Sequence, residues 1–185
     1  MKVAIGADHG GYRLKESLKA FLEKKGYEIV DVGAHDEAPT DYPDIARNLA
    51  EALINKEAER GILICGSGAG ASIAANKFQG IRASVCHDCY TAHQAVEHDN
   101  MNVLCLGARV IGQVLAEEIV LSFLQAEFKP EERYLRRLKK IEEIEAGWKG
   151  KKLIHDYIVE SLKVKLRTQY KEITENITGK NRAVA

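Results

Sequence analysis

Short apolar runs and amphipathic stretches alternate along the first 128 residues of the chain. The apolar runs predict strands at 2–6, 27–33, 61–65, 81–86 and 102–107. Between them, apolar residues recur at helical spacing and predict helices near 12–25, 43–55, 69–78, 90–97 and 110–125. Because strands that alternate with helices form parallel sheets covered on both faces, the pattern predicts an α/β fold with a five-stranded, mostly parallel, doubly wound sheet.

The pattern changes after residue 145. Ile154, Ile158, Leu162 and Leu166 are spaced by four residues and predict an amphipathic helix. We therefore expect a domain at 1–145 and a helical C-terminal extension at 146–185 with a frayed end, joined by a hinge at the glycines 147 and 150. An apolar stripe on one helix has to pack against another surface. A second copy of this chain is the expected surface, and another part of the same chain or a separate protein are the alternatives.

Composition narrows the class of protein. Lys and Arg number 27, as do Asp and Glu, but residues 129–185 hold 15 basic and 9 acidic side chains. These charges interleave at helical spacing without the aromatic residues of nucleic-acid-binding surfaces, so we expect a solvated helix face and no nucleic-acid partner. The chain has no apolar run of membrane-spanning length, no signal-peptide pattern at its start, and too few cysteines for a disulfide framework. A cytoplasmic protein with no membrane association is expected.

Candidate chemistry gathers where the predicted strands end. The third strand ends at Cys65, and the glycines at 66, 68 and 70 leave backbone N–H groups unmasked that can receive an anion. Polar residues also lie beside other strands: Asp8 and His9 after the first, Tyr42 after the second, and His98 to Asn100 before the fifth. Because ligands of such folds bind at the carboxyl ends of strands, this convergence predicts a functional site that includes Cys65.

Each signal has a structural alternative. Cys65 can be the last buried residue of a strand, Asp8 can cap the following helix, and His98 can complement a helix C-terminus. A dinucleotide dehydrogenase is disfavoured, because the GSGAG turn follows the third strand and no acidic residue ends the next one. The sequence Cys86-His87-Asp88-Cys89 lacks the second ligand pair of a zinc site, so we expect a strand end and a loop without metal.

Several motifs together resemble one family. They are GADHGG at 6–11, TDYP at 40–43, ICGSGAGASIAANK at 64–77, GIRA at 80–83, EHDNMNVLCLGARVIG at 97–112, and the pair Arg133 and Arg137. In order and spacing they resemble ribose-5-phosphate isomerase B and its sugar-phosphate isomerase relatives, over about residues 1–145. The resemblance implies a Rossmann-like αβα sandwich and an aldose-ketose isomerase that uses no metal and no cofactor. It also implies an obligate homodimer with active sites shared between subunits, with a dimer of dimers left open.

The resemblance further implies roles for individual residues. Cys65 would be the general base that moves a proton between C1 and C2, and His98 of the neighbouring subunit would open the sugar ring with help from Ser67. The enediolate oxygen would be held by backbone N–H groups of Gly66, Gly68, Ala69 and Gly70. The remaining substrate contacts would come from Asp8 on sugar hydroxyls, from Tyr42 and Asn100, and from His9, Arg133 and Arg137 on the phosphate.

The expected reaction is the interconversion of ribose 5-phosphate and ribulose 5-phosphate, a step of pentose phosphate metabolism. Isomerisation of galactose 6-phosphate, allose 6-phosphate or a tetrose phosphate is the first alternative, because the shared motifs do not fix the length of the sugar. A non-catalytic sugar-phosphate-binding subunit is the second, although binding alone does not require a base at Cys65. One departure concerns Tyr134, which stands where ribose-phosphate enzymes often have a histidine after the first arginine.

Overall fold

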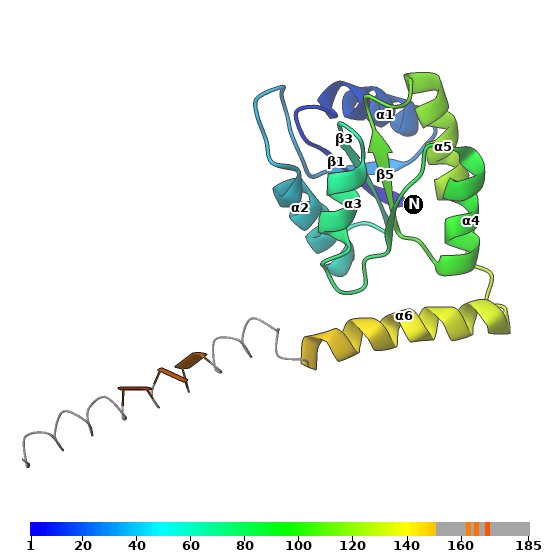
Figure 1. The fold of residues 1–185 in the computed structure, drawn as a ribbon. Coiled ribbons are helices and arrows are strands. Elements are labelled where there is room, and N and C mark those ends of the chain that lie inside the picture. Colours follow the sequence, from blue (N-terminus) through cyan, green and yellow to red (C-terminus); the bar gives the residue numbers. More distant parts are fainter. Residues whose placement is uncertain (151–161, 164, 167–168, 171–185) are drawn as a thin grey trace, which may run out of the picture. The chain divides into compact units, whose positions relative to one another are not determined.

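The computed structural model describes residues 1–150 and, beyond them, residues 162, 163, 165, 166, 169 and 170. Strands and helices alternate as the sequence predicts (Figure 1). In chain order they are β1 (Lys2–Ala7), α1 (Tyr12–Lys24), β2 (Glu28–Asp31), α2 (Tyr42–Ile54), β3 (Arg60–Cys65), α3 (Ala69–Ala75), β4 (Ala83–Val85), α4 (Cys89–Asp99), β5 (Val103–Gly107), α5 (Gln113–Gln125) and α6 (Glu132–Gly150). Contacts divide the chain into Met1–Glu142, which contains the whole sheet, and a second unit from Glu143 onward.

The five strands form one sheet in the order β2-β1-β3-β5-β4, and every neighbouring pair is parallel. The predicted α/β fold class is therefore confirmed. The two edge strands, β2 and β4, are shorter than the apolar runs at 27–33 and 81–86 suggest. A strand at the edge of a sheet has a hydrogen-bonding partner on one side only, and short edge strands are usual.

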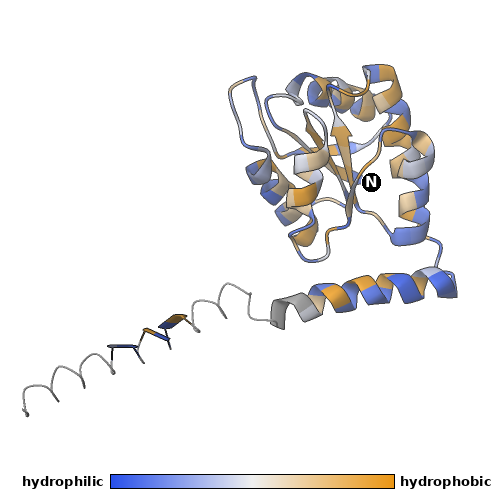
Figure 2. Cartoon of the chain, viewed as in Figure 1, coloured by the Kyte–Doolittle hydropathy of each residue, from blue (hydrophilic) through white to orange (hydrophobic). Residues whose placement is uncertain are grey.

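Alternate residues of each central strand enter two separate cores. On β3, Ile62 and Ile64 pack with residues of α1, α4 and α5, whereas Leu63 and Cys65 pack with α2 and α3. Successive strand side chains point to opposite faces, so a sheet covered on both sides needs continuous apolar strands, as observed here. Figure 2 shows the apolar strands at the centre and helices of mixed hydropathy around them.

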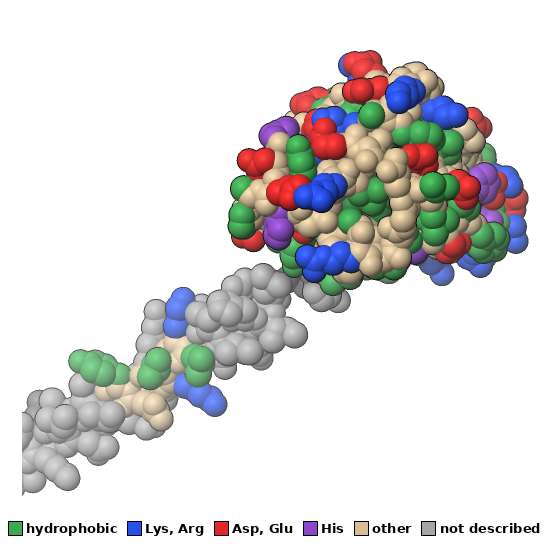
Figure 3. Space-filling model, turned by 90° about the horizontal axis from the view of Figure 1, so that it is seen from above, with side chains coloured by type: hydrophobic (Ala, Val, Ile, Leu, Met, Phe, Trp, Pro, Cys, Tyr) green, Lys and Arg blue, Asp and Glu red, His purple; other side chains and the backbone are tan. Residues whose placement is uncertain are grey.

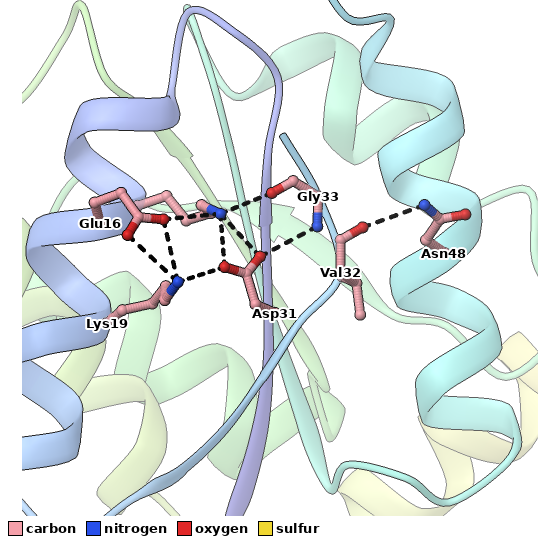
Figure 4. A network of polar contacts seen from close by, with 7 residues as sticks. Glu16, Lys19, Asp31, Val32, Gly33 and Asn48 are labelled. Carbon is pink, nitrogen blue, oxygen red and sulfur yellow. Dashed lines mark hydrogen bonds and ion pairs between the residues drawn. The ribbon is translucent and has the colours of Figure 1, made fainter. Parts of the chain in front are cut away.

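A buried ion-pair network joins α1 to β2. The side chain of Lys15 is fully buried, and its Nζ lies 2.8 Å from both carboxylate oxygens of Asp31 and from the carbonyl oxygen of Gly33. Lys19 and Glu16 complete the network (Figure 4). Burial alone would raise the pKa of Asp31, but hydrogen bonds from Lys15 and Lys19 hold it below its ordinary value. The network fixes the chain at the point where β2 ends.

Helix α6 runs without a break through Gly147, where the sequence predicted a hinge, so that prediction is wrong at this residue. A glycine inside a helix costs about 1 kcal/mol, which the good helix formers before it can offset. Most of the helix predicted from the stripe at 154–166 lies outside the described residues, and the boundary at 145/146 stays a prediction. In the part of the chain that the structure describes, none of the helices is long and apolar enough to cross a membrane.

Candidate active site

A cleft of about 390 Å³ opens where β1, β3 and β5 end. This is the switch point of the sheet, because α1 leaves β1 toward one face while α3 leaves β3 toward the other. The lining residues are Asp8, Tyr42, Cys65, Gly66, Ser67, Gly70, Arg109 and Val110. Six of these eight were predicted from the sequence. Viewed from this end of the sheet, the surface mixes acidic, basic, histidine and hydrophobic side chains among other side chains and backbone (Figure 3).

Cys65 is the last residue of β3 and lies at the wall of the cleft with 5% of its surface exposed. The backbone N–H of Gly68 donates to its Sγ at 3.1 Å and fixes the position of the sulfur. Gly68 has φ of 82°, a left-handed conformation that a residue with a side chain adopts only with strain. The turn that brings this donor to the sulfur therefore depends on glycine.

Two further cysteines are buried without lining the cleft. Cys105 lies in the same core cluster as Cys65, and Cys86 lies in the cluster on the opposite face of the sheet. Burial raises the pKa of both thiols, which keeps them protonated at neutral pH. Of these three buried thiols, only Cys65 lines the cleft.

Asp8 both contacts the start of the following helix and lines the cleft, which are the two alternatives that the sequence left open. Its Oδ1 accepts a hydrogen bond from the N–H of Gly11 at 3.0 Å, at the start of α1, and the same residue lines the cleft. His9 is exposed, does not line the cleft, and contacts the backbone of Thr40 through Nδ1 at 3.2 Å. The loop before α2 is therefore tied to the loop after β1.

Tyr42, the first residue of α2, packs its ring against Gly70 across the cleft. A Cβ atom added at Gly70 would lie 2.8 Å from the Cζ atom of this ring, closer than real contacts allow. The missing side chain at Gly70 therefore lets the aromatic ring approach the glycine-rich loop.

Arg109 is a cleft residue that the sequence interpretation missed. It follows the end of β5 by two residues, and its N–H donates to the carbonyl oxygen of Gly66 at 3.0 Å. The side chain is exposed, passes close to Gly66, and forms no ion pair within residues 1–150. Its place after a central strand was the available signal, because the carboxyl ends of parallel strands share one edge.

A second group of predicted residues lies at the opposite end of the sheet, where the strands begin. His98 is in the last turn of α4, and four residues later the carbonyl oxygen of Asn102 accepts from the N–H of Gly61 at the start of β3. From Gly61 to Cys65, β3 spans about 13 Å. Within one chain, His98 therefore lies near the amino end of β3, whereas Cys65 lies at its carboxyl end.

His98 packs against the beginning of α6. Its ring stacks on Tyr134 with centroids 4.2 Å apart, and its Nε2 lies 2.7 Å from the Tyr134 hydroxyl. Arg133 donates to the same hydroxyl and pairs with Glu131 at 2.9 Å. Tyr134 is 2% exposed and anchors α6, while Arg137, one turn further on, is exposed. We call His98, Arg133 and Tyr134 the α4–α6 cluster.

The remaining predicted site residues are Ser67, Ala69 and Asn100. Ala69 is exposed beside the cleft, and its N–H lies 3.4 Å from the Ser67 hydroxyl. Asn100 ends α4 in a left-handed conformation, with its carbonyl oxygen accepting from Arg82 Nε at 2.6 Å. Asn100 therefore lies with the α4–α6 cluster and not at the cleft.

A profile of the family described as Ribose/Galactose Isomerase matches residues 3–141. The chain belongs to the ribose/galactose isomerase family. Ribose-5-phosphate isomerase B of Escherichia coli is 44% identical over 78% of this chain and 96% of its own. The D-erythrulose-4-phosphate isomerase of Pectobacterium atrosepticum is 45% identical over 70% of this chain and 86% of its own.

The solved structure of Clostridium thermocellum ribose-5-phosphate isomerase B is 50% identical, with a TM-score of 0.78 over 80% of this chain and 99% of that one. The family resemblance inferred from the motifs is thus confirmed, as is the fold. Membership of the ribose/galactose isomerase family makes this protein a sugar-phosphate isomerase, an intramolecular oxidoreductase that interconverts aldoses and ketoses.

Proposed function

We propose that this isomerase interconverts ribose 5-phosphate and ribulose 5-phosphate with Cys65 as the general base. The observation that carries the proposal is the position of Cys65 Sγ at the wall of the cleft, 3.1 Å from the N–H of Gly68. A base at this place can reach the carbon of a substrate bound in the cleft. Arg109 and Asp8 lie in the same cleft, where a phosphate and sugar hydroxyls need donors and acceptors.

The proposed chemistry needs no external oxidant. In the open-chain aldose, the base takes the proton from C2, and the electrons of that bond form the C1–C2 double bond of an enediolate with its charge on O1. Return of the proton to C1, with transfer of a proton from O2 to O1, yields the ketose. Gly66 and Ser67 line the cleft, and among the described residues their N–H groups have no backbone acceptor, so we propose that they stabilise this charge.

We also propose a homodimer with shared active sites. In one chain, His98 and Arg133 contact the same tyrosine near the amino end of β3, about 13 Å along the strand from Cys65, and Arg137 follows on the same helix, which favours a site completed by a second chain. A two-fold dimer that places the α4–α6 cluster of one chain over the cleft of the other would complete both sites at once. His98 would then open the sugar ring, and the two arginines would add forked donors for the phosphate.

A tetrose phosphate is the second candidate substrate. The relative that acts on D-erythrulose 4-phosphate is as similar to this chain as the Escherichia coli ribose-5-phosphate isomerase B. Overall similarity therefore favours neither sugar. The choice between a pentose phosphate and a tetrose phosphate depends on which of them the protein converts with the higher kcat/KM.

The deciding experiment is a panel of aldose phosphates with four, five and six carbons, assayed for ketose formation with chelator present. Ribose 5-phosphate should give the highest kcat/KM, and Cys65→Ser, which keeps the size of the side chain, should abolish most of that turnover. A higher kcat/KM with another sugar would reassign the substrate while leaving the base in place. Binding of phosphosugars without turnover of any of them would indicate a binding subunit.

A further inference from the structure

His87 has no role in the chemistry above, yet its side chain contacts the end of the strand that supports the cleft. It lies between β4 and α4, is half-buried, and its Nε2 accepts a hydrogen bond from the N–H of Gly107 at 3.0 Å. Gly107 is the last residue of β5 and sits opposite Cys65 in the sheet register. The contact therefore joins the loop after the edge strand β4 to β5, the strand that pairs with β3 at Cys65.

The hydrogen bond takes the place of a missing ladder contact. On the β3 side, the next N–H of the chain, that of Ala108, donates to the carbonyl oxygen of Cys65 at 2.9 Å. The N–H of Gly107 faces the other way, toward β4, because successive N–H groups of a strand point to opposite sides. β4 ends at Val85, so the imidazole of His87 supplies the acceptor that a longer β4 would have supplied from its backbone.

Gly107 in turn packs directly against the glycine-rich loop that follows Cys65. A Cβ atom at Gly107 would lie 2.8 Å from the carbonyl carbon and oxygen of Ser67, so the two backbones are in tight contact. Arg109, two residues later, donates its N–H to the carbonyl oxygen of Gly66 at 3.0 Å. A shift of Gly107 would therefore move the peptides on both sides of Ser67, and with them the Gly68 N–H that holds the Cys65 sulfur.

We infer that His87 is a positioning residue for the Cys65 loop, and that it acts as the neutral tautomer with its proton on Nδ1. A backbone N–H can only donate, so the Nε2 that faces Gly107 has to carry a lone pair. Gly107 is buried, and a buried N–H without an acceptor is strongly disfavoured. The inference rests on the proposed role of Cys65 for its effect on catalysis, but not for the hydrogen bond itself.

The test compares two substitutions of His87. His87→Gln keeps an acceptor of similar reach, whereas His87→Leu keeps the bulk and removes the acceptor. His87→Leu should lower kcat by about 10- to 100-fold with KM changed by less than about threefold, the size expected for a small displacement of a catalytic group. His87→Gln should stay within about fivefold of the wild type, and His93→Leu, on the exposed face of α4, should change nothing. Equal kcat for the Gln and Leu variants would overturn the inference.

Two readouts do not depend on the identity of the substrate. Long-range ¹H–¹⁵N spectra of the wild-type protein at about pH 8, where histidines are mostly neutral, should show His87 protonated on Nδ1, and a proton on Nε2 would refute the contact. The rate at which iodoacetamide alkylates Cys65, followed by peptide mass spectrometry, should change in His87→Leu and be restored in His87→Gln. If the wild type isomerises no sugar phosphate, the proposed function fails while these two measurements still decide the role of His87.

Discussion

The cleft and the α4–α6 cluster hold their functional groups by different means. At the cleft, Cys65 is held by its own strand and by one backbone N–H of the glycine-rich loop, that of Gly68. In the α4–α6 cluster, side chains hold one another, with His98 stacked on Tyr134 and Arg133 bonded to the tyrosine hydroxyl. The first arrangement depends on the sheet and the loops at its carboxyl end, whereas the second depends on the docking of the first turns of α6. A single chain therefore contains two separate groups of candidate residues: the proposed base at the cleft, and the proposed acid and phosphate ligands in the α4–α6 cluster.

The largest effect should come from removing the proposed base at the cleft. Cys65→Ala should lower kcat by about 10²- to 10⁴-fold, the range of general acid–base catalysis, while KM changes little. Cys105→Ala, in the same core but away from the cleft, is the matched control and should affect stability more than kcat. Steady-state kinetics and thermal unfolding of both variants measure the difference. A Cys65→Ala enzyme with near wild-type kcat would remove this residue from the mechanism.

The next largest effect should come from removing the arginines proposed to bind the phosphate, which should raise KM more than it lowers kcat. Arg109→Ala at the cleft and Arg133→Ala in the α4–α6 cluster should each raise KM by about 10- to 100-fold, since a charge-assisted hydrogen bond contributes about 1.5–3 kcal/mol. Inhibition by inorganic phosphate should weaken in parallel. Arg136→Ala, on the same helix as Arg133 and also exposed, serves as the control and should leave KM unchanged. Unaltered phosphate inhibition in both test variants would place the anion elsewhere.

Mixing inactive chains tests whether the two regions meet between subunits. If they do, a dimer of one Cys65→Ala chain and one His98→Ala chain has one site with both defects and one intact site. Random exchange makes half of the dimers mixed, so about a quarter of the wild-type activity should return. A mixture of Cys65→Ala with Cys65→Ser provides the control, because every site then lacks the thiol. Absence of recovery after exchange is verified by mass would show that both residues act within one chain.

The smallest effect concerns stability and not turnover. Asp31→Asn should lower the unfolding free energy by about 3 kcal/mol at pH 7, because the fully buried Lys15 would lose the less exposed of its two carboxylate partners and keep only Glu16. The folded pKa of Asp31 lies below its ordinary value of 3.8, so the stabilisation is present above about pH 4 and is lost as pH falls through the folded pKa. The melting temperatures of wild type and variant should therefore converge at acidic pH. Glu37→Gln, in an exposed pair with Arg13, is the control, and an equal loss there would refute the network's importance.

Sequence pattern predicted the strands, their parallel arrangement and most of the cleft, for a physical reason. Residues that follow parallel strands share one edge of the sheet, so Asp8, Tyr42 and Cys65 could be placed together from the order of the predicted elements alone. Arg109 could have been predicted from its place after β5, but the contact of His87 could not, because it depends on which strands are neighbours and on where β4 ends. Tyr134 likewise looks like any aromatic residue of an amphipathic helix until α6 is docked on His98.

The packing of Tyr42 on Gly70 has an evolutionary consequence. A side chain at position 70 would overlap the ring at position 42 in its present place, although the two residues lie on different helices with β3 between them. The constraint is one-sided: position 42 can lose its ring while position 70 stays glycine, but position 70 can gain a side chain only after the ring at position 42 has moved or been lost. Within the family, a larger residue at 70 is therefore expected where position 42 is not aromatic.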